Sequence, residues 1–181
     1  MTLSGNESVR MGLAGQLATL WRYGLVLSGS RQTAEDLVQA TCLRALERAS
    51  QFTPGTRLDH WLRAILRSIW LNEIRAQRLR QGAGWVPAEE VLTFDGREQI
   101  ETNIFAAQVL RQMRAVPEAQ REALYLVYGE GLTYAEAAQA LDIPIGTVMS
   151  RLAAGRARLA DLGEEIKGPG REPSRGQDAG R

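Results

Sequence analysis

The segment of residues 133–162, TYAEAAQALDIPIGTVMSRLAAGRARLADL, constrains the fold of this chain more than any other part of it. Thr133 and Glu136 have the spacing of a capping box, which predicts that a helix begins there. Pro144 ends this helix, because proline lacks an N–H and disfavours a helical residue before it. A second helix is expected to begin at residue 145 or 146 and to run to Gly163. Two helices joined by a tight turn predict a helix-turn-helix, whose second helix lies in the major groove of DNA.

The second of these helices has two different faces when successive residues are placed about 100° apart. One face is predicted to be buried and carries Val148, Leu152, Gly155 and Leu159. The opposite face carries small or short residues and one methionine, namely Gly146, Met149, Ser150, Ala153, Ala154 and Ala157. Arg151 and Arg158 flank that face on one side and Arg156 on the other, which suits a helix between two walls of phosphates. The alternative interpretation is a solvated Ala/Arg helix in an ordinary bundle.

Composition excludes several classes of protein. The formal net charge is only +1, so any nucleic-acid contact must come from local basic patches. The single cysteine, Cys42, excludes an internal disulfide and a cysteine-cluster metal site, and we expect it to act as a small core residue and not a redox group. His60 is the only histidine, so we expect no metal, no cofactor and no enzyme activity. There is no signal peptide and no long apolar run, which predicts a soluble, cytoplasmic protein without membrane insertion.

The pattern along the chain is almost entirely helical and predicts an all-α fold of two small helical domains. A flexible acidic linker, rich in glycine and carboxylates, joins them, and the C-terminal tail is expected to be disordered. The expected boundaries are 7–80 for the first domain, 81–102 for the linker, 103–162 for the second domain and 163–181 for the tail. The helices are expected at 7–27, 33–49 (with Thr33 and Asp36 as an N-cap pair), 59–80, 103–115 and 117–129 (with Pro117 at its first position).

The helix at 59–80 is basic and carries aromatic residues. Arginines bind phosphates and exposed aromatics stack on unpaired bases, so the combination suits melted DNA. Trp61, Ile65 and Ile69 recur at helical spacing, however, and are better interpreted as a core stripe, whereas Phe52 in the preceding Pro-Gly loop could be buried or exposed. The basic residues of this region are Arg57, Arg63, Arg67, Arg75, Arg78 and Arg80.

The helix at 33–49 has a different character. Leu37, Thr41 and Ala45 are expected to point inward. Four polar residues can face outward, namely Glu35, Asp36, Gln39 and Arg44. An acidic pair at a helix start is by itself only favourable to the helix dipole.

Three stretches in this order and spacing resemble the extracytoplasmic-function sigma factors of bacterial RNA polymerase. They are AEDLVQATCLRAL, FTPGTRLDHWLRAILRSIWLNEIR and VPEAQREALYLVYGEGLTYAEAAQALDIPIGTVMSRLAAGRARL, and the resemblance covers about residues 12–162. Each motif alone would be weak evidence, but the three in register are strong evidence. The resemblance implies a factor that binds the polymerase core and directs promoter recognition, DNA melting and initiation of transcription.

The resemblance also implies roles for particular residues. The first domain is similar to sigma region 2, in which Glu35, Asp36, Gln39 and Arg44 would contact the coiled coil of the polymerase β′ clamp. The loop of Phe52 would capture a flipped −10 base, with Arg57, Arg63, Arg67, Ser68 and Arg75 as further −10 contacts. The second domain is similar to sigma region 4, in which the segment 124–127 would face the β flap. Its −35 contacts would be Thr133, Thr147, Met149, Ser150, Arg151, Arg156 and Arg158, and the acidic linker would lie in the RNA path of the polymerase.

The chain departs from the family pattern at several of these positions. Ser68 stands where asparagine is frequent, and Asn72 where aspartate is frequent. Met149 and Ala154 stand where many members carry a basic residue. We therefore expect −35 recognition to depend on DNA shape, on Ser150 and on the flanking arginines.

Two other functions were weighed against promoter-specific initiation. One is a sigma mimic, a binding module that sequesters an anti-sigma factor and never touches DNA, but such mimics usually carry a receiver domain, for which no strand–helix alternation is present. The other is an enzyme, for which no nucleophile–base pair, phosphate loop or metal cluster stands out. The resemblance also implies an anti-sigma partner that covers one or both domains.

Overall fold

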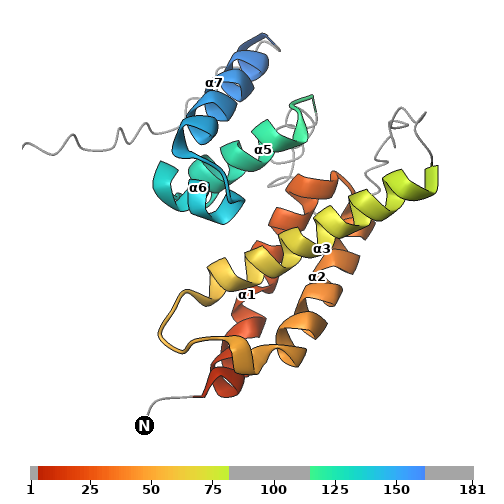
Figure 1. Ribbon diagram of the computed structural model, residues 1–181, viewed down its shortest axis with the longest axis vertical. Helices are drawn as coiled ribbons and strands as arrows, with labels where there is room; N and C mark the ends of the chain where they lie inside the picture. Colours follow the sequence, from red (N-terminus) through yellow and green to blue (C-terminus); the bar gives the residue numbers. More distant parts are fainter. Residues whose placement is uncertain (1–3, 82–114, 162–181) are drawn as a thin grey trace, which may run out of the picture. The chain divides into compact units, whose positions relative to one another are not determined.

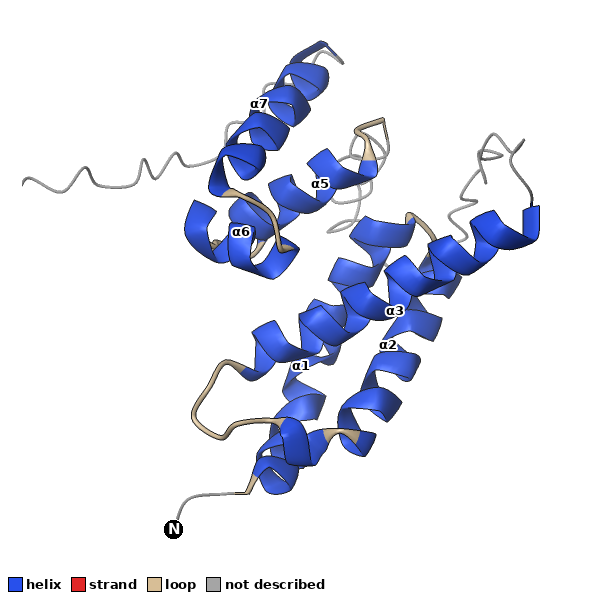
Figure 2. Ribbon diagram, in the orientation of Figure 1, coloured by secondary structure: helices blue, strands red, loops and turns tan. Residues whose placement is uncertain are grey.

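The computed structural model describes residues 4–81 and 115–161, and these residues form helices, turns and loops without any strand (Figure 2). The prediction of an all-α fold is therefore confirmed. Gln81, the first residue of the expected linker, is the last residue of the third helix, and the rest of the linker lies outside the described residues, as do the expected helix at 103–115 up to its last residue and the expected tail. The chain divides into two compact units, Met1–Leu110 and Arg111–Arg181, and each is considered by itself.

The first unit is a bundle of three long helices, α1 (Gly5–Ser28), α2 (Arg31–Glu47) and α3 (Leu58–Gln81), with a short 3-10 turn, η1 (Ala49–Gln51), after α2 (Figure 1). Each of the three long helices packs against the other two. Burial of apolar side chains from all three stabilises the bundle. The largest buried side chains at its centre are Leu20, Tyr23, Leu27, Leu37, Leu62 and Leu66.

The prediction that Thr33 and Asp36 cap the second helix is wrong, because α2 begins two residues earlier. Gly29 ends α1 in the left-handed conformation with φ 67°. Ser30 is extended and its side chain accepts a hydrogen bond from the Thr33 N–H at 3.3 Å. The two residues Gly29 and Ser30 thus suffice to reverse the chain, and Thr33 already lies in the first turn.

The predicted core stripe of α3 is also wrong by one position. Leu62 and Leu66 are fully buried, whereas Trp61, Ile65 and Ile69 are half-buried at the edge of the core. A rotation of one residue, about 100°, separates the two stripes. The aliphatic leucines therefore fill the centre of the bundle and the bulkier Trp61 covers its rim.

The second unit contains α5 (Glu118–Leu124), a π-helical turn, η2 (Tyr125–Gly129), and then α6 (Tyr134–Leu141) and α7 (Ile145–Asp161). Pro117 is extended, with ψ 142°, so it is the N-cap of α5 and not the predicted first helical residue. The capping box is confirmed, since Thr133 Oγ1 accepts from the Glu136 N–H at 3.2 Å and Glu136 Oε2 accepts from the Thr133 N–H at 2.8 Å. Asp142, with φ 53°, ends α6 ahead of Pro144.

The buried face of α7 agrees with the prediction. Val148, Leu152, Gly155 and Leu159 are all buried. Gly155 permits a close approach of α5, because a Cβ atom there would lie 2.8 Å from Leu124 Cδ1. The helix-turn-helix therefore packs on α5 through this one face of α7.

The glycines of α1 provide a test of the packing of the first unit, where the start of α1 lies against the turn after α2. Gly5→Ala should lower the free energy of unfolding by about 1–3 kcal/mol, because its Cβ would lie 2.5 Å from the Phe52 carbonyl oxygen and 2.6 Å from that of Ala49. Gly15→Ala is the matched control on the same helix, since nothing lies within 4 Å of its Cβ. It should stabilise the protein by about 0.5–1 kcal/mol. Urea denaturation followed by tryptophan fluorescence measures both, and equal effects of the two changes would contradict the packing described.

Candidate nucleic-acid interface

The outward face of α7 is the first candidate surface, and its composition agrees with the prediction. The side chains on it are exposed, namely those of Met149, Ser150, Ala153, Ala154 and Ala157, and Gly146 is exposed with them. Ile145, at the first position of α7, is 49% exposed and adds an apolar side chain that the sequence analysis did not single out. A helix face of this kind is narrow enough to approach base edges closely.

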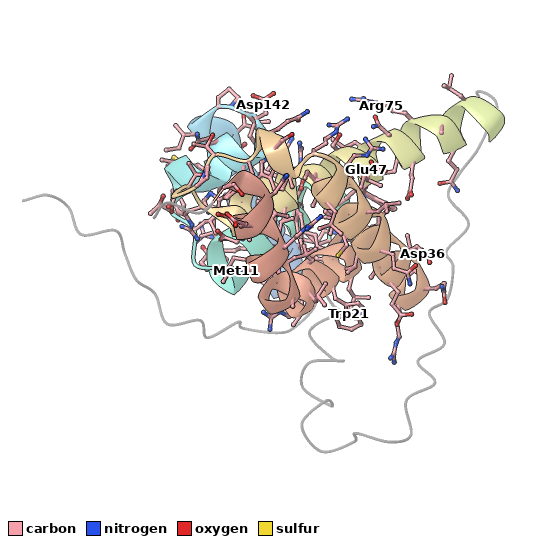
Figure 3. The ribbon with its side chains drawn as sticks, turned by 90° about the horizontal axis from the view of Figure 1, so that it is seen from below. Met11, Trp21, Asp36, Glu47, Arg75 and Asp142 are labelled. Carbon is pink, nitrogen blue, oxygen red and sulfur yellow. The ribbon has the colours of Figure 1, made fainter. Side chains whose placement is uncertain are left out.

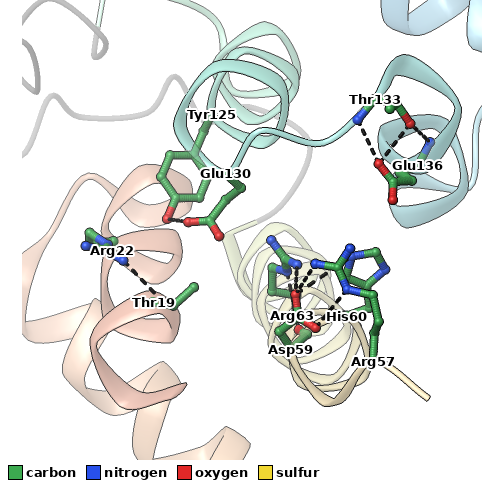
Figure 4. A network of polar contacts seen from close by, with 10 residues as sticks. All are labelled: Thr19, Arg22, Arg57, Asp59, His60, Arg63, Tyr125, Glu130, Thr133 and Glu136. Atoms are coloured by element: carbon green, nitrogen blue, oxygen red, sulfur yellow. Dashed lines mark hydrogen bonds and ion pairs between the residues drawn. The ribbon is translucent and has the colours of Figure 1, made fainter. Parts of the chain in front are cut away.

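The hydroxyl groups near this face are engaged in local hydrogen bonds. Ser150 Oγ donates to the Thr147 carbonyl oxygen at 3.0 Å, one turn earlier. Thr133 Oγ1 donates to Glu136 Oε2 at 2.8 Å and is part of the capping box (Figure 4). Thr147 is half-buried. Thr133 therefore acts in this structure as a helix cap, and Ser150 keeps only its acceptor capacity for a base.

The arginines at the margins of α7 differ in their surroundings. Arg156 is exposed and its Nη1 donates to the Tyr128 hydroxyl at 3.5 Å. Arg158 Nε donates to the Ala115 carbonyl oxygen at 3.0 Å, so this side chain holds the segment before α5 against the end of α7. Arg151 is half-buried. Burial raises the pKa of Tyr128 despite the opposing charge of Arg156, so the phenol remains a neutral partner of the guanidinium.

The second candidate surface is on α3, and here the structure corrects one predicted contact. Arg63 was expected to contact a phosphate, but it is buried and its Nη2 lies 2.6 Å from Asp59 Oδ2. Arg57, which is exposed, pairs with the same carboxylate at 2.8 Å, and His60 Nε2 lies 3.8 Å from it (Figure 4). In this conformation Arg63 therefore stabilises the N-terminus of α3. Its guanidinium is buried with the Asp59 carboxylate and is not exposed for a contact with DNA.

The charges around Asp59 determine its ionisation. Burial raises the pKa of Asp59, but the hydrogen bond from Arg57 and the positive charges of Arg63, His60 and Arg57 outweigh burial and hold the pKa below its usual value. Asp59 is thus a carboxylate at neutral pH. It also lies in the first turn of α3, where a negative charge favours the helix dipole.

The remaining predicted residues of α3 lie further along the helix. Ser68 and Arg75 are exposed and Arg67 is half-buried. Arg75 projects from α3 (Figure 3) and its Nη1 lies 3.5 Å from Asn72 Oδ1, one turn earlier. The side chains of Arg78 and Arg80 lie outside the described part of the structure. Among the described side chains, the basic surface is therefore made by Arg57, directly before α3, and by Arg67 and Arg75 on the helix.

Phe52 is buried and its ring packs against Trp61, with ring centroids 5.3 Å apart and an interplanar angle of 53°. The question that the sequence left open is thus decided for this conformation, and Phe52 is not available to stack on a base. The exposed part of the loop is instead residues 53–56, closed by a hydrogen bond from Thr56 Oγ1 to the Thr53 carbonyl oxygen at 2.7 Å. The Pro-Gly pair, with Gly55 at φ 84°, was the signal in the sequence for this turn.

The outward face of α2 is a third candidate surface. Leu37, Thr41 and Ala45 are buried as predicted, while Asp36, Gln39 and Arg44 are exposed and Glu35 is half-buried. Glu35 pairs with Arg31 at 3.1 Å, and Asp36 projects outward (Figure 3). Leu43, 63% exposed, and Leu46, 45% exposed, join this face, and the sequence analysis missed them because it sought only polar residues there.

Two titratable groups, Cys42 on α2 and Glu73 on α3, have a raised pKa. Burial and the nearby charge of Asp36 raise the pKa of Glu73 on α3. Burial also raises the pKa of the Cys42 thiol, which keeps it protonated, as expected for a packing residue. No group of three or more His, Cys, Asp or Glu side chains within the described residues could hold a metal ion.

The segment expected to face the β flap needs a partial correction. Leu124 and Leu126 are buried, so they stabilise the second unit. Tyr125 and Val127 are half-buried and Tyr128 is 51% exposed, and these side chains form the accessible side of η2.

None of the helices within the described residues is long and apolar enough to span a membrane.

Comparison with known proteins identifies the family to which this helical chain belongs. Residues 16–80 match Sigma-70 region 2, and residues 106–159 match Sigma-70 region 4. The extracytoplasmic-function (ECF) RNA polymerase sigma factor EcfG of Rhodopseudomonas palustris is 33% identical over 169 residues, which cover 90% of this chain and 91% of that protein. The ECF sigma factor SigC of Mycobacterium tuberculosis is 35% identical over 143 residues, 78% of this chain and 76% of that protein.

Solved structures agree with this assignment. The sigma factor RpoE from Bartonella quintana, solved in complex with the anti-sigma factor NepR, matches with a TM-score of 0.66 at 27% identity, over 86% of this chain and 96% of that one. CnrH, solved in complex with the cytosolic domain of CnrY, has the same fold, with a TM-score of 0.55 at 19% identity over 87% of this chain and 86% of that one. The chain belongs to the sigma-70 family and, within it, to the ECF sigma factors. It is thus a promoter-recognition factor of bacterial RNA polymerase.

The ion pairs of Asp59 predict a specific dependence of stability on pH. The pKa of Asp59 is lower in the folded protein than its unfolded value of about 3.9, so its contribution is present above that pH and is lost as pH falls through the folded pKa. Asp59→Asn should therefore cost about 3 kcal/mol at pH 7, by leaving the buried Arg63 without its carboxylate. Urea denaturation at pH 7 and at pH 3 should show the variant and the wild type converging in acid.

Glu73→Gln is the matched control, with the opposite sign. The pKa of Glu73 is raised, so the folded state disfavours its charge, and the loss of that charge should stabilise the protein at pH 7 and not in acid. A parallel loss of stability by both variants at neutral pH would contradict the network around Asp59.

Proposed function

We propose that this ECF sigma factor contacts its promoter through two separate surfaces, the outward face of α7 for the −35 element and the outward side of α3 with the loop 53–56 for the −10 element. The observation that carries the proposal is the exposed face of α7, where small side chains lie between arginines while Val148, Leu152 and Leu159 are buried on the other side. A helix of that shape fits the major groove, and its marginal arginines suit the phosphates.

The −10 surface combines Arg57, Arg67, Ser68 and Arg75 with the exposed turn after Phe52. The ring contact between Phe52 and Trp61 holds the residue just before this turn, and the ion pair between Arg63 and Asp59 stabilises the start of α3. Extraction of a base from the duplex costs a few kcal/mol, which a preorganised turn and phosphate contacts can offset. In this proposal Phe52 and Arg63 position the −10 surface, and the exposed residues contact DNA.

The outward face of α2 is proposed to dock on the β′ clamp of the polymerase core. Asp36, Gln39 and Arg44 provide polar contacts, and Leu43 and Leu46 provide apolar area that is otherwise in water. A mixture of an apolar centre and polar groups around it is typical of a protein interface. The accessible side of η2, with Tyr125, Val127 and Tyr128, is the corresponding proposal for the β flap.

An anti-sigma factor is proposed as the partner that restrains this protein. RpoE of Bartonella quintana is seen with the anti-sigma factor NepR, and CnrH with the cytosolic domain of CnrY. The same apolar and polar surface of α2 that is proposed for the polymerase would be available to such a partner. A factor that binds core polymerase and chromosomal DNA works where these are, so we place this protein in the cytoplasm, as a binding factor without catalysis of its own.

Runoff transcription tests the proposal directly. The full chain is added to RNA polymerase core and a library of upstream sequences from its own genome, and transcripts with defined start sites are expected. A sigma mimic would give none, because it binds only an anti-sigma factor. Failure to co-elute with core polymerase and failure to produce any transcript would together refute initiation by this protein.

The exposed and the buried arginine of α3 should behave differently toward DNA. Arg75→Ala should weaken binding of holoenzyme to a forked −10 duplex and reduce the slope of log K against log salt concentration by about 1, because one phosphate contact is lost. Arg63→Ala should leave that slope unchanged and lower the stability of the protein, because Arg63 is buried with Asp59. Fluorescence anisotropy over a salt series measures the slopes.

Arg10→Ala, an exposed arginine on α1, is the matched control and should leave the salt slope as it is in the wild type. A slope that changes equally for Arg10→Ala and Arg75→Ala would remove the basis for placing the −10 contact on α3.

A further inference from the structure

The exposed apolar pair at the start of α7 is not explained by the contacts proposed so far. Met149 is 53% exposed and Ile145 is 49% exposed. The two residues are four positions apart, so their side chains lie side by side along one line of the helix. Both lie in the first turns of α7, the part of a recognition helix that contacts base edges.

The outward face of this part of α7 offers few hydrogen bonds to a base, while Thr147 and Arg151 are half-buried at its margin. Ser150 Oγ donates to the Thr147 carbonyl oxygen at 3.0 Å, and the other residues of the outward face apart from Met149 are glycine or alanine. The guanidinium groups of Arg156 and Arg158 are directed to the Tyr128 hydroxyl and the Ala115 carbonyl oxygen. A bidentate contact to guanine, which needs a long basic side chain in the middle of the face, is therefore not provided at Met149.

The bases restrict what an apolar side chain can recognise. In the major groove, thymine is the base that presents a methyl group, on C5 beside its O4 acceptor, whereas the other three bases present hydrogen-bond donors and acceptors and no methyl group. Arginines lie on both sides of the exposed face, which favours a polyanion over an apolar protein surface as the occupant. The Met149 side chain is also unbranched and flexible, so it can adjust its conformation to contact a methyl group.

We propose that Met149, supported by Ile145, recognises the methyl group of a thymine in the −35 element and so determines specificity at that position. This inference rests on the proposed function, since it requires that α7 lies in the major groove. It adds an apolar contact to the sequence-based expectation that −35 recognition depends on DNA shape, on Ser150 and on the flanking arginines, since the Ser150 hydroxyl is bonded to its own helix and keeps only its acceptor capacity.

Deoxyuridine provides the test, because it differs from thymidine only by the missing methyl group. Duplexes with a randomised −35 region are first selected with holoenzyme made from the full chain and polymerase core. Each thymine of the selected −35 element is then replaced by deoxyuridine, one at a time, and affinity is measured by gel shift. At one or two positions the wild type should bind about fourfold more weakly, the effect of one methyl-sized apolar group. Met149→Ala should bind the thymidine and deoxyuridine duplexes equally at those positions.

Two variants serve as controls for this ratio. Met149→Leu keeps an apolar side chain and should keep the preference for thymidine. Met11→Ala removes another exposed methionine, 72% exposed and located on α1, and should also keep it. Both test whether the effect belongs to the apolar group at position 149 and not to methionine loss in general.

Several outcomes would overturn the proposal, and they are distinguishable. If holoenzyme selects a −35 element but binds deoxyuridine and thymidine equally at every position, Met149 does not recognise a methyl group. If Met149→Ala retains the preference, another residue is responsible. If no upstream sequence is selected and none is transcribed, the proposed function itself fails and this inference fails with it.

Discussion

The packing of α7 against α5 is the constraint on which the arrangement of the proposed −35 surface depends. Gly155 lies where a Cβ atom would come within 2.8 Å of Leu124 Cδ1, so the two helices approach as closely as they do only because this residue has no side chain. Val148, Leu152 and Leu159 are buried along the same line of α7. Once that line is buried, helix geometry leaves residues 146, 149, 150, 153, 154 and 157 on the exposed side. Burial of one face of α7 therefore determines which residues are exposed on the other. Because the buried face holds the helix in place, the exposed face can consist of small side chains.

The basic helix of the first unit shows that charge count alone does not define a DNA surface. Arg57 and Arg63 share the carboxylate of Asp59, and Arg63 is buried in doing so. Their positive charge is partly neutralised at the start of α3, while Arg67 and Arg75 lie on the later turns. The attraction for a phosphate backbone is thus displaced toward the later part of the helix. The carboxylate in turn orients the two guanidinium groups.

The helices, their main caps and the buried face of α7 could be predicted from the sequence, because periodicity and capping chemistry act locally. The capping box of Thr133 and Glu136 is an example, since both partners lie within one turn. What could not be predicted depends on partners distant in sequence. Burial of Phe52, which the sequence left open, depends on Trp61, and burial of Arg63 depends on how Leu62 and Leu66 turn α3 toward the core. A shift of one residue in the buried stripe moved Trp61 to the rim, and no local pattern distinguishes these two rotations. The exposed Leu43 and Leu46 were missed for a related reason, since apolar residues in a helix are expected to be buried until the packing shows otherwise.

The two proposed promoter surfaces differ in the kind of binding energy they can supply, and this bears on how the protein would select its sites. The α3 surface offers arginines, whose contacts with phosphates are strong, screened by salt and independent of sequence. The exposed face of α7 offers short and apolar side chains, whose contacts are weak individually but depend on which base is opposite. If the proposed surfaces bind as described, most of the affinity would come from charge and from the polymerase, and α7 would contribute mainly differences between sequences. Met149 fits that division, because an apolar side chain adds no charge-based affinity common to all sequences and offers a contact that only a methyl-bearing base can make.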